Sequence, residues 1–174
     1  MIRVRPVNAG DFDAVAALTN HFIVNTAIHF STERVTPDGL RAAWESSRRR
    51  YPFLVAVDEH GFAGYAKAGV WRERAAYQWT PEVGIYIEER TRGRGVGKTL
   101  YRALLDEMKA RGFRSAVAGI TLPNEPSIRL HERVGFIKCG HVRDAGFKLG
   151  AWHDVGFWQA VLDEGPGVPA ALPM

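Results

Sequence analysis

The feature that most constrains the fold of this chain is residues 82–108, in which a strand pattern, a glycine-rich basic turn and a helix pattern follow one another. Apolar side chains alternate with other residues through positions 82–88, which is the pattern of a half-buried strand. Beyond the turn, apolar residues recur at helical spacing from Val96 to Met108. The turn itself, residues 92–98, reads Arg-Gly-Arg-Gly-Val-Gly-Lys. This order predicts a strand that enters a helix through a turn with little side-chain bulk.

The turn predicts a phosphate-binding loop. Its glycines leave backbone N–H groups accessible, and the N-terminus of the following helix carries a partial positive charge. Arg92, Arg94 and Lys98 add full positive charges. Two common phosphate motifs are excluded by spacing, because a P-loop needs glycine at Arg92 and a dinucleotide fingerprint needs glycine at Lys98 or Leu100. The pattern that remains is Arg-x-x-Gly-x-Gly, beginning at Arg92.

Length and composition indicate one domain, which we place at residues 1–162, followed by a proline- and glycine-rich tail at residues 163–174. The 174 residues are 46% hydrophobic and 24% charged, so the chain can bury a substantial core. The net charge of +4 is modest, and the arginine triplet at residues 48–50 is interpreted as a solvated helix end, so we expect no nucleic-acid partner.

No stretch of the sequence approaches the roughly 20 apolar residues of a membrane span, and the first residues lack a signal-peptide pattern, so we expect no membrane association. The single cysteine, Cys139, excludes an intrachain disulfide and favours a cytoplasmic location. It is interpreted as a packing residue.

The remaining patterns predict an α/β chain with a mixed sheet. Helices are expected after Asn8 or Asp11, from a Thr36 cap through Trp44, and after Asn124. Besides residues 82–88, strands are expected at residues 2–5, 53–57, 62–70, 115–120, 136–142 and 152–162.

Four segments carry a resemblance to known proteins: residues 71–82, 92–97, 122–132 and 146–159, the last of which contains Trp-His-Asp-Val-Gly-Phe-Trp. The glycine-rich turn resembles the acetyl-CoA pyrophosphate loop of the GCN5-related N-acetyltransferase (GNAT) superfamily. The four segments together resemble the phosphinothricin N-acetyltransferases, a group that includes bialaphos-resistance enzymes and methionine sulfoximine acetyltransferases. The resemblance runs from about residue 3 to residue 162.

The resemblance implies the acyl-CoA N-acyltransferase fold, with a central mixed sheet of about seven strands flanked by helices. The sheet is expected to splay between the strand ending near Ile87 and the strand starting near Ser115. The gap between these strands would admit the pantetheine arm of acetyl-CoA, the implied cosubstrate. No metal is implied, because Gly135 stands where a zinc motif beginning at His131 needs its second histidine.

The implied cosubstrate contacts combine the basic turn with a strand edge and a second helix. Backbone groups of the strand would pair with pantetheine, and unpaired N–H groups there could stabilise an oxyanion. Asn124 is also explained as a helix N-cap, and Arg133 as a solvated helix residue. The residues that the resemblance places around the cosubstrate are Ile85, Tyr86, Ile87, Arg92, Gly93, Arg94, Gly95, Val96, Gly97, Lys98, Asn124 and Arg133.

The implied reaction is direct transfer of an acetyl group to an amine in a ternary complex. Glu82 and His131 stand at positions that carry the proposed general bases in the family. A surface carboxylate and a packed histidine are the alternatives. The expected acceptor is a small amino acid with an α-carboxylate and a tetrahedral γ-group, gripped by arginines. The acceptor-binding residues implied are Phe30, Arg72, Arg74, Tyr77, Glu82, Gly84 and Val155; relatives often carry lysine where Arg72 stands.

The expected function is therefore N-acetylation of phosphinothricin, with methionine sulfoximine or methionine sulfone as the alternative acceptor. A protein or peptide N-acetyltransferase and a non-catalytic acyl-CoA sensor also remain open. The resemblance further implies a homodimer formed near the C-terminal strands, where Trp152, Phe157 and Trp158 concentrate aromatic area. An aromatic cluster packed inside one subunit is the alternative.

Overall fold

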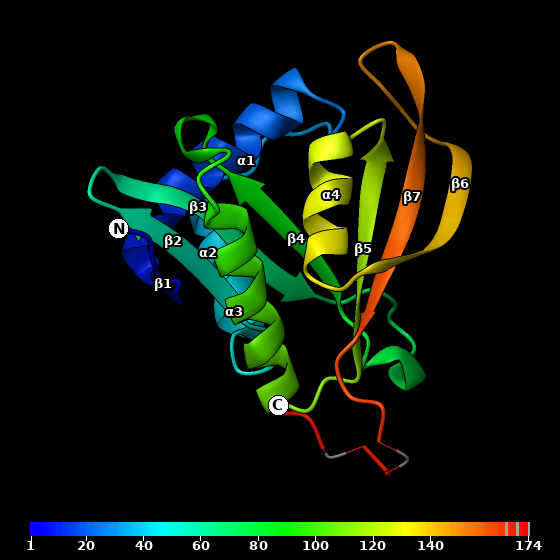
Figure 1. Cartoon of the computed structure of the whole chain (residues 1–174). Helices are drawn as coiled ribbons and strands as arrows, with labels where there is room; N and C mark the ends of the chain where they lie inside the picture. The colour runs from blue at the N-terminus through cyan, green and yellow to red at the C-terminus, as the bar shows by residue number, and fades with distance from the viewer. Residues whose placement is uncertain (166, 170, 174) are drawn as a thin grey trace.

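A seven-stranded mixed sheet organises the chain, and the glycine-rich turn joins its central strand to its longest helix (Figure 1). The computed structural model describes residues 1–165, 167–169 and 171–173. The described strands follow the order β1-β2-β3-β4-β5-β7-β6. They are β1 (Arg3–Pro6), β2 (Phe53–Asp58), β3 (Gly61–Gly69), β4 (Glu82–Ile87), β5 (Ser115–Leu122), β6 (Ile137–Lys148) and β7 (Ala151–Val161). The α-helices are α1 (Phe12–Asn25), α2 (Pro37–Ser47), α3 (Val96–Ala110) and α4 (Glu125–Arg133).

A hydrophobic core lies on each face of the sheet, so β2 is buried on both sides. Leu54 and Ala56 belong to the larger core, which α3 and α4 cover, whereas Val55 belongs to a second core under α1 and α2. Figure 1 shows the two helix pairs on opposite sides of the strands. The alternation of side chains along a strand produces this arrangement.

Local signals set the helix ends. The Thr36 hydroxyl accepts a hydrogen bond from the Gly39 N–H at 3.1 Å, and Pro37 occupies the first turn of α2. Asn124 caps α4 by accepting from the Ser127 N–H at 3.3 Å. Gly135 follows α4 with a φ of 98°, a left-handed conformation that favours glycine. The predicted helix positions are confirmed, although α2 continues to Ser47.

The splay between β4 and β5 is the feature that opens the sheet. In the described chain these parallel strands pair at one position, Glu82 with Val117. By contrast, β3 and β4 pair at six positions and β5 and β7 at eight. Beyond Glu82, one edge of β4 therefore separates from the rest of the sheet, as the resemblance predicted.

Three sequence-based expectations differ from the structure. β6 extends to Lys148 rather than ending near Val142, and its register with β7 shifts between Val142 and Gly146. Cys139 is exposed, so its interpretation as a packing residue was wrong. In the predicted loose tail, Leu172 packs against the larger core. Residues 166, 170 and 174 of that tail lie outside the described residues.

Within the described part of the chain, no helix combines the length and apolar character needed to cross a membrane.

Candidate active site

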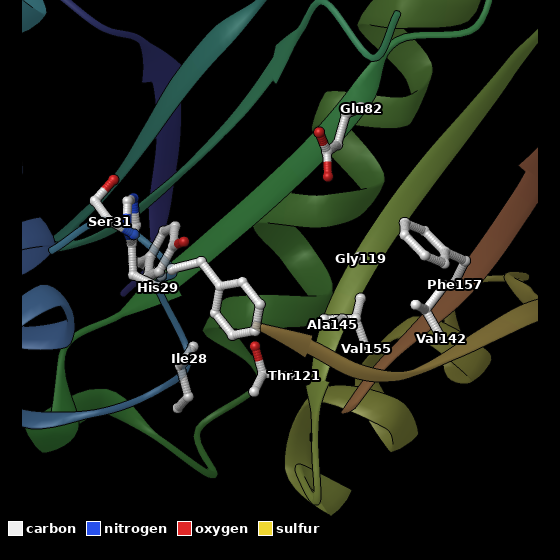
Figure 2. Close-up of a pocket in the computed structure, with 12 residues that line it drawn as sticks. Ile28, His29, Ser31, Glu82, Gly119, Thr121, Val142, Ala145, Val155 and Phe157 are labelled. Atoms are coloured by element: carbon white, nitrogen blue, oxygen red, sulfur yellow. The ribbon is translucent and has the colours of Figure 1, made fainter. Parts of the chain in front are cut away.

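A cavity of about 560 Å³ opens beside the splay between β4 and β5. One wall comes from the connection between α1 and α2, and the others come from β4, β5, β6 and β7 (Figure 2). Apolar side chains dominate the lining, with a few polar groups among them, which is typical of small-molecule sites. The lining residues are Ile28, His29, Phe30, Ser31, Glu82, Tyr86, Gly119, Thr121, Val142, Ala145, Val155 and Phe157.

Among the described residues that line this cavity, Glu82 is the one carboxylate. It is the first residue of β4, at the point where β4 and β5 separate. Gly119 of β5 faces it, and a Cβ placed on Gly119 would lie 3.3 Å from Glu82 Oε1. Glu82 stays exposed to solvent in the open cavity, but partial desolvation raises its pKa, while the cations of Arg72 and Lys67 oppose this rise. A carboxylate whose pKa is raised toward the working pH is suited to accept a proton.

His29 also lines the cavity, although no sequence pattern predicted a role for it. Its Nδ1 accepts a hydrogen bond from the Ser31 N–H at 3.1 Å, so the proton of the neutral ring lies on Nε2. Burial lowers the pKa of His29, and the cations of Lys67 and Lys148 lower it further. His29 is therefore a neutral donor in the cavity. The sequence around His29 has no helix or strand pattern. The only signal that could have indicated a site is the aromatic pair His29 and Phe30 in this irregular segment.

His131 lies elsewhere, buried between α3 and the end of α4 with 3% of its surface exposed. Its Nδ1 donates to the Ser127 carbonyl at 2.7 Å, and its Nε2 accepts from the Tyr101 hydroxyl at 2.8 Å. The ring also packs against Phe136. Burial lowers the pKa of His131. The structure thus brings Glu82, and not His131, into the cavity wall; the role of His131 in proton transfer stays a prediction.

The glycine-rich turn has the backbone form that a phosphate cradle needs. Gly93 and Gly95 have φ values of 75° and 80°, and Gly95 begins α3 without any side-chain cap. The first N–H groups of a helix have no partner within it, so they are available to an anion. A Cβ on either glycine would meet no atom within 4 Å, so the space above the turn is open. Gly97 instead allows α3 to pack closely on α4, because a Cβ placed on it would lie 3.0 Å from Leu130 of α4.

The side chains of the turn differ in their contacts and in their exposure to solvent. Arg92 lies over the Phe22 ring at 5.9 Å, Val96 is buried, and Lys98 is exposed. The Arg94 guanidinium lies 3.7 Å from Glu59. Arg92, Arg94 and Lys98 are all exposed, so their positive charges are accessible to an anion such as a pyrophosphate.

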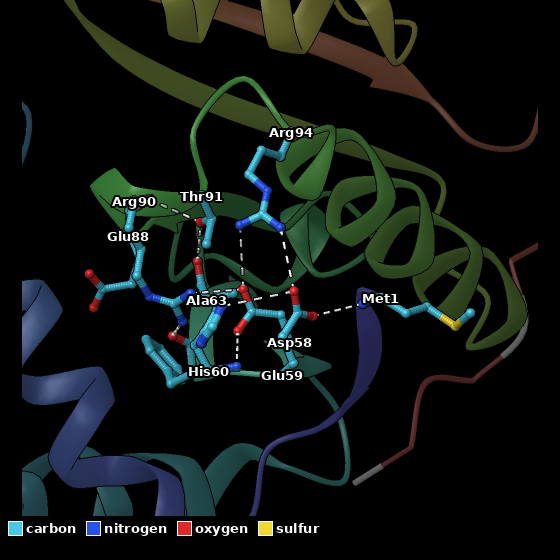
Figure 3. Close-up of polar contacts among 10 residues, drawn as sticks. Met1, Asp58, Glu59, His60, Ala63, Glu88, Arg90, Thr91 and Arg94 are labelled. Atoms are coloured by element: carbon cyan, nitrogen blue, oxygen red, sulfur yellow. Dashed lines mark hydrogen bonds and ion pairs between the residues drawn. The ribbon is translucent and has the colours of Figure 1, made fainter.

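An ion-pair network anchors this turn to the β2–β3 hairpin (Figure 3). Arg90, just before the turn, donates to Asp58 at 2.8 Å and to the Phe62 carbonyl at 2.6 Å. Arg94 lies 3.9 Å from the same Asp58 carboxylate. The hydrogen bond from Arg90 is the main cause that lowers the pKa of Asp58 to about 2, so this carboxylate is ionised at neutral pH. The Met1 ammonium pairs with the neighbouring Glu59 at 2.8 Å.

The predicted acceptor residues divide into two groups. Phe30 and Val155 line the cavity, and Gly84 lies on β4 two residues after Glu82. Arg72 stacks on Trp71 at 5.3 Å and is close enough to Glu82 to influence its pKa.

The other predicted contacts lie outside this cavity wall. Arg74 and Tyr77 are exposed on the segment before β4, and Arg133 is exposed in the last turn of α4. Ile85 and Ile87 lie on β4 beyond its pair with β5. Among the residues described, no group of three His, Cys, Asp or Glu side chains is arranged to hold a metal.

Comparison with known proteins places the fold and the site in context. The model of the acetyltransferase (GNAT) family matches residues 17–136. A phosphinothricin N-acetyltransferase from Streptomyces viridochromogenes is 48% identical over 158 residues, which cover 91% of this chain and 86% of that protein. An L-methionine sulfoximine/L-methionine sulfone acetyltransferase from Salmonella typhimurium is 34% identical, with 92% of this chain and 95% of that protein covered.

A solved structure of a phosphinothricin acetyltransferase from Sinorhizobium meliloti, in complex with acetyl-CoA, superposes with a TM-score of 0.91. The two sequences are 31% identical, and the match covers 97% of this chain and 93% of the other.

Proposed function

The chain belongs to the GNAT family of acetyltransferases, and from this premise we propose that it acetylates the α-amino group of phosphinothricin. It is an acetyl-CoA-dependent N-acetyltransferase of the phosphinothricin and methionine sulfoximine type. The observation that carries the proposal is the position of Glu82, a carboxylate with a raised pKa in a small cavity at the point where β4 and β5 part.

The residues of the chain supply binding and proton transfer. Acetyl-CoA, when bound, supplies the activated acetyl group. The turn of residues 92–98 would hold its pyrophosphate through backbone N–H groups, and the edge of β4 beyond Glu82 would pair with its amides. Glu82 would accept a proton from the acceptor ammonium, directly or through water. Direct transfer needs no covalent nucleophile, and the single cysteine is exposed on β6.

Cations that act on two cavity residues support an acidic amino acid as the acceptor. The charges of Lys67 and Arg72 act on Glu82, and those of Lys67 and Lys148 act on His29, although these cations are not among the residues that line the cavity. The His29 Nε2–H adds a neutral donor. These groups suit an acceptor with two anionic ends, as in phosphinothricin, better than neutral methionine sulfoximine.

Turnover of acetyl-CoA by the purified chain tests the proposal. The acceptors are phosphinothricin, methionine sulfoximine, methionine sulfone, other free amino acids, and peptides with a free amino terminus. We expect phosphinothricin to be preferred, mainly through a lower KM, and peptides to be inactive. Turnover with peptides alone would identify a peptide acetyltransferase. Acetyl-CoA binding without turnover of any acceptor would identify a sensor.

Replacing Arg74 with alanine tests whether this exposed arginine, which does not line the cavity, contacts the bound acceptor as the resemblance implies. Loss of a charge-assisted contact costs about 1.5–3 kcal/mol, so KM for phosphinothricin should rise about 10- to 100-fold, and more than KM for methionine sulfoximine. The matched control is Arg102→Ala, which removes an exposed arginine from α3. An equal effect of Arg74→Ala on both acceptors would show that Arg74 does not select between them.

We also propose a homodimer that works in the cytoplasm, a location that the single cysteine favours. Of the three aromatic residues on which the dimer prediction rests, Trp152 is 62% exposed, whereas Phe157 lines the cavity and Trp158 is buried. Phe147 and Leu149, 59% and 62% exposed, extend the apolar surface around Trp152. Light scattering at micromolar concentration should give twice the chain mass; the monomer mass would contradict the dimer.

A further inference from the structure

The connection between α1 and α2 supplies a third of the cavity lining without any regular secondary structure in residues 28–31. Its two ends are tied to α1. The Thr26 hydroxyl donates to the Phe22 carbonyl at 2.7 Å, and the Asn20 side chain exchanges two hydrogen bonds with the backbone of Val35, at 2.8 and 2.9 Å. The middle of the connection, residues 28–31, needs other contacts to keep one position.

His29 packs on Tyr86 of β4 with ring centroids 5.8 Å apart, and two further contacts come from β6, more than 100 residues later in the chain. The Lys148 ammonium donates a hydrogen bond to the His29 carbonyl. Lys148 is only 7% exposed, and no described carboxylate forms an ion pair with it. Burying an ammonium is costly unless it is well hydrogen-bonded. A lysine kept at such a position therefore points to a function of this contact.

The second contact is the packing of Phe30 on Gly146 of β6. A Cβ on Gly146 would lie 2.5 Å from Phe30 Cε2, 3.0 Å from Cδ2 and 3.1 Å from Cζ. No real Cβ atom tolerates the shortest of these distances, so the Phe30 ring occupies its position only because residue 146 is glycine. Both contacts join the wall of residues 28–31 to the opposite wall.

A bulge in β6 brings Gly146 and Lys148 into this position. The register with β7 shifts between Val142 and Gly146, and Asp144 adopts a left-handed conformation with a φ of 47°. The Asp144 N–H donates to Asp154 of β7 at 3.0 Å, which fixes the bulge. Bulges are frequent next to functional sites, where they redirect side chains. Here the bulged segment also supplies Val142 and Ala145 to the cavity wall.

We propose that Gly146 and Lys148 form a clamp that positions residues 28–31 and thereby determines which acceptor the cavity admits. They are positioning residues that act through His29 and Phe30. The clamp rests on the proposed function for its effect on selectivity, although its structural effect does not depend on any acceptor.

Gly146→Ala tests the packing half of the clamp. The added Cβ must displace the Phe30 ring, and overpacking of this kind should raise KM for the acceptor about tenfold or more. KM for acetyl-CoA should stay within about twofold, because the turn of residues 92–98 is not altered. Gly140→Ala is the matched control on the same strand, since its Cβ would lie at an ordinary 3.7 Å from Phe157.

A double-variant cycle isolates the contact with Phe30. In a Phe30→Ala background the ring is gone, so Gly146→Ala should change the acceptor KM by less than about twofold. An effect of Gly146→Ala that persists undiminished in this background would overturn the clamp. A rise in both KM values alike would overturn it too.

Hydrogen exchange tests the lysine half without any acceptor. Lys148→Met keeps the length of the side chain but removes its donor, so amides of residues 28–31 should exchange about tenfold faster or more. Lys138→Met, at an exposed position of β6, is the control and should leave this exchange unchanged. Equal exchange in the two variants would overturn the clamp. If the wild type acetylated no amino acid, the proposed function would fail while this exchange comparison still decided the clamp.

Discussion

Replacing His131 with alanine separates a structural role of this histidine from a chemical one. The imidazole joins α3 to α4 from inside the core, because it bonds Tyr101 on one side and the Ser127 carbonyl on the other. Alanine at this position leaves the Tyr101 hydroxyl, which is completely buried, without its acceptor. It also removes the ring contacts with Tyr101 and Phe136, whose centroids lie 4.9 and 5.2 Å away.

The expected cost follows from these contacts. A buried hydroxyl left without a partner costs about 1–3 kcal/mol, and each aromatic contact contributes about 0.5–1.5 kcal/mol. The sum predicts a loss of about 2–6 kcal/mol in the free energy of unfolding. For a chain of this length each kcal/mol lowers Tm by about 2–4 °C, so His131→Ala should lower Tm by about 4–24 °C.

The assay pairs thermal and denaturant unfolding with turnover at a temperature where the variant is folded. Since His131 does not line the cavity, we expect turnover per folded molecule to fall by less than about tenfold. His60→Ala is the control, because the His60 side chain is 68% exposed and its loss should cost less than about 0.5 kcal/mol.

The pH dependence of stability provides a second measurement. Burial lowers the pKa of His131, so the unfolded chain, with the ordinary pKa of 6.5, binds this proton more tightly than the folded chain. The stability that the neutral ring contributes is therefore present above pH 6.5 and is lost as the pH falls through the lowered pKa of the folded state. His131→Ala should remove this part of the acid sensitivity.

One result would refute the structural role. If His131→Ala shifted Tm by less than about 2 °C and lowered turnover about 10²- to 10⁴-fold, His131 would take part in proton transfer, as the family resemblance implies.

Two further predictions concern the chemistry and the cosubstrate. Glu82→Gln should lower turnover about 10²- to 10⁴-fold. In the wild type, kcat/KM should rise with pH as the Glu82 carboxyl, whose pKa is raised, loses its proton, and the variant should lack this rise. If the rise persisted unchanged in the variant, Glu82 would not be the base. Gly95→Glu should abolish acetyl-CoA binding, since a side chain at a φ of 80° is strained and a carboxylate repels phosphate; calorimetry that gave unchanged affinity would contradict the phosphate assignment.

The elements that could be predicted from the sequence are those whose signals are local. The Thr36 cap of α2 and the turn that leads into α3 each depend on residues within a few positions of one another. The splay of the sheet could be predicted only from the family resemblance, because no local sequence pattern indicates where two neighbouring strands separate.

The parts that could not be predicted depend on contacts between distant residues. His29 lines the cavity, and its carbonyl accepts a hydrogen bond from Lys148, 119 residues away. The extension of β6 depends on Asp154 of the next strand, which accepts from Asp144. The sequence analysis proposed both Glu82 and His131 as bases, and tertiary packing directs Glu82 into the cavity and His131 into the core.

The single pair that joins β4 to β5 has a consequence for the lifetime of the protein. A ligand lying in the splay would act as a tie between the half of the sheet that ends with β4 and the half that begins with β5. Any ligand that binds only the native state stabilises it by mass action, by about 2.7 kcal/mol at a concentration one hundred times its Kd. The fraction of unfolded chains open to proteases would then fall about 100-fold as acetyl-CoA accumulated. Abundance of the enzyme would in this way follow the supply of its own acetyl donor.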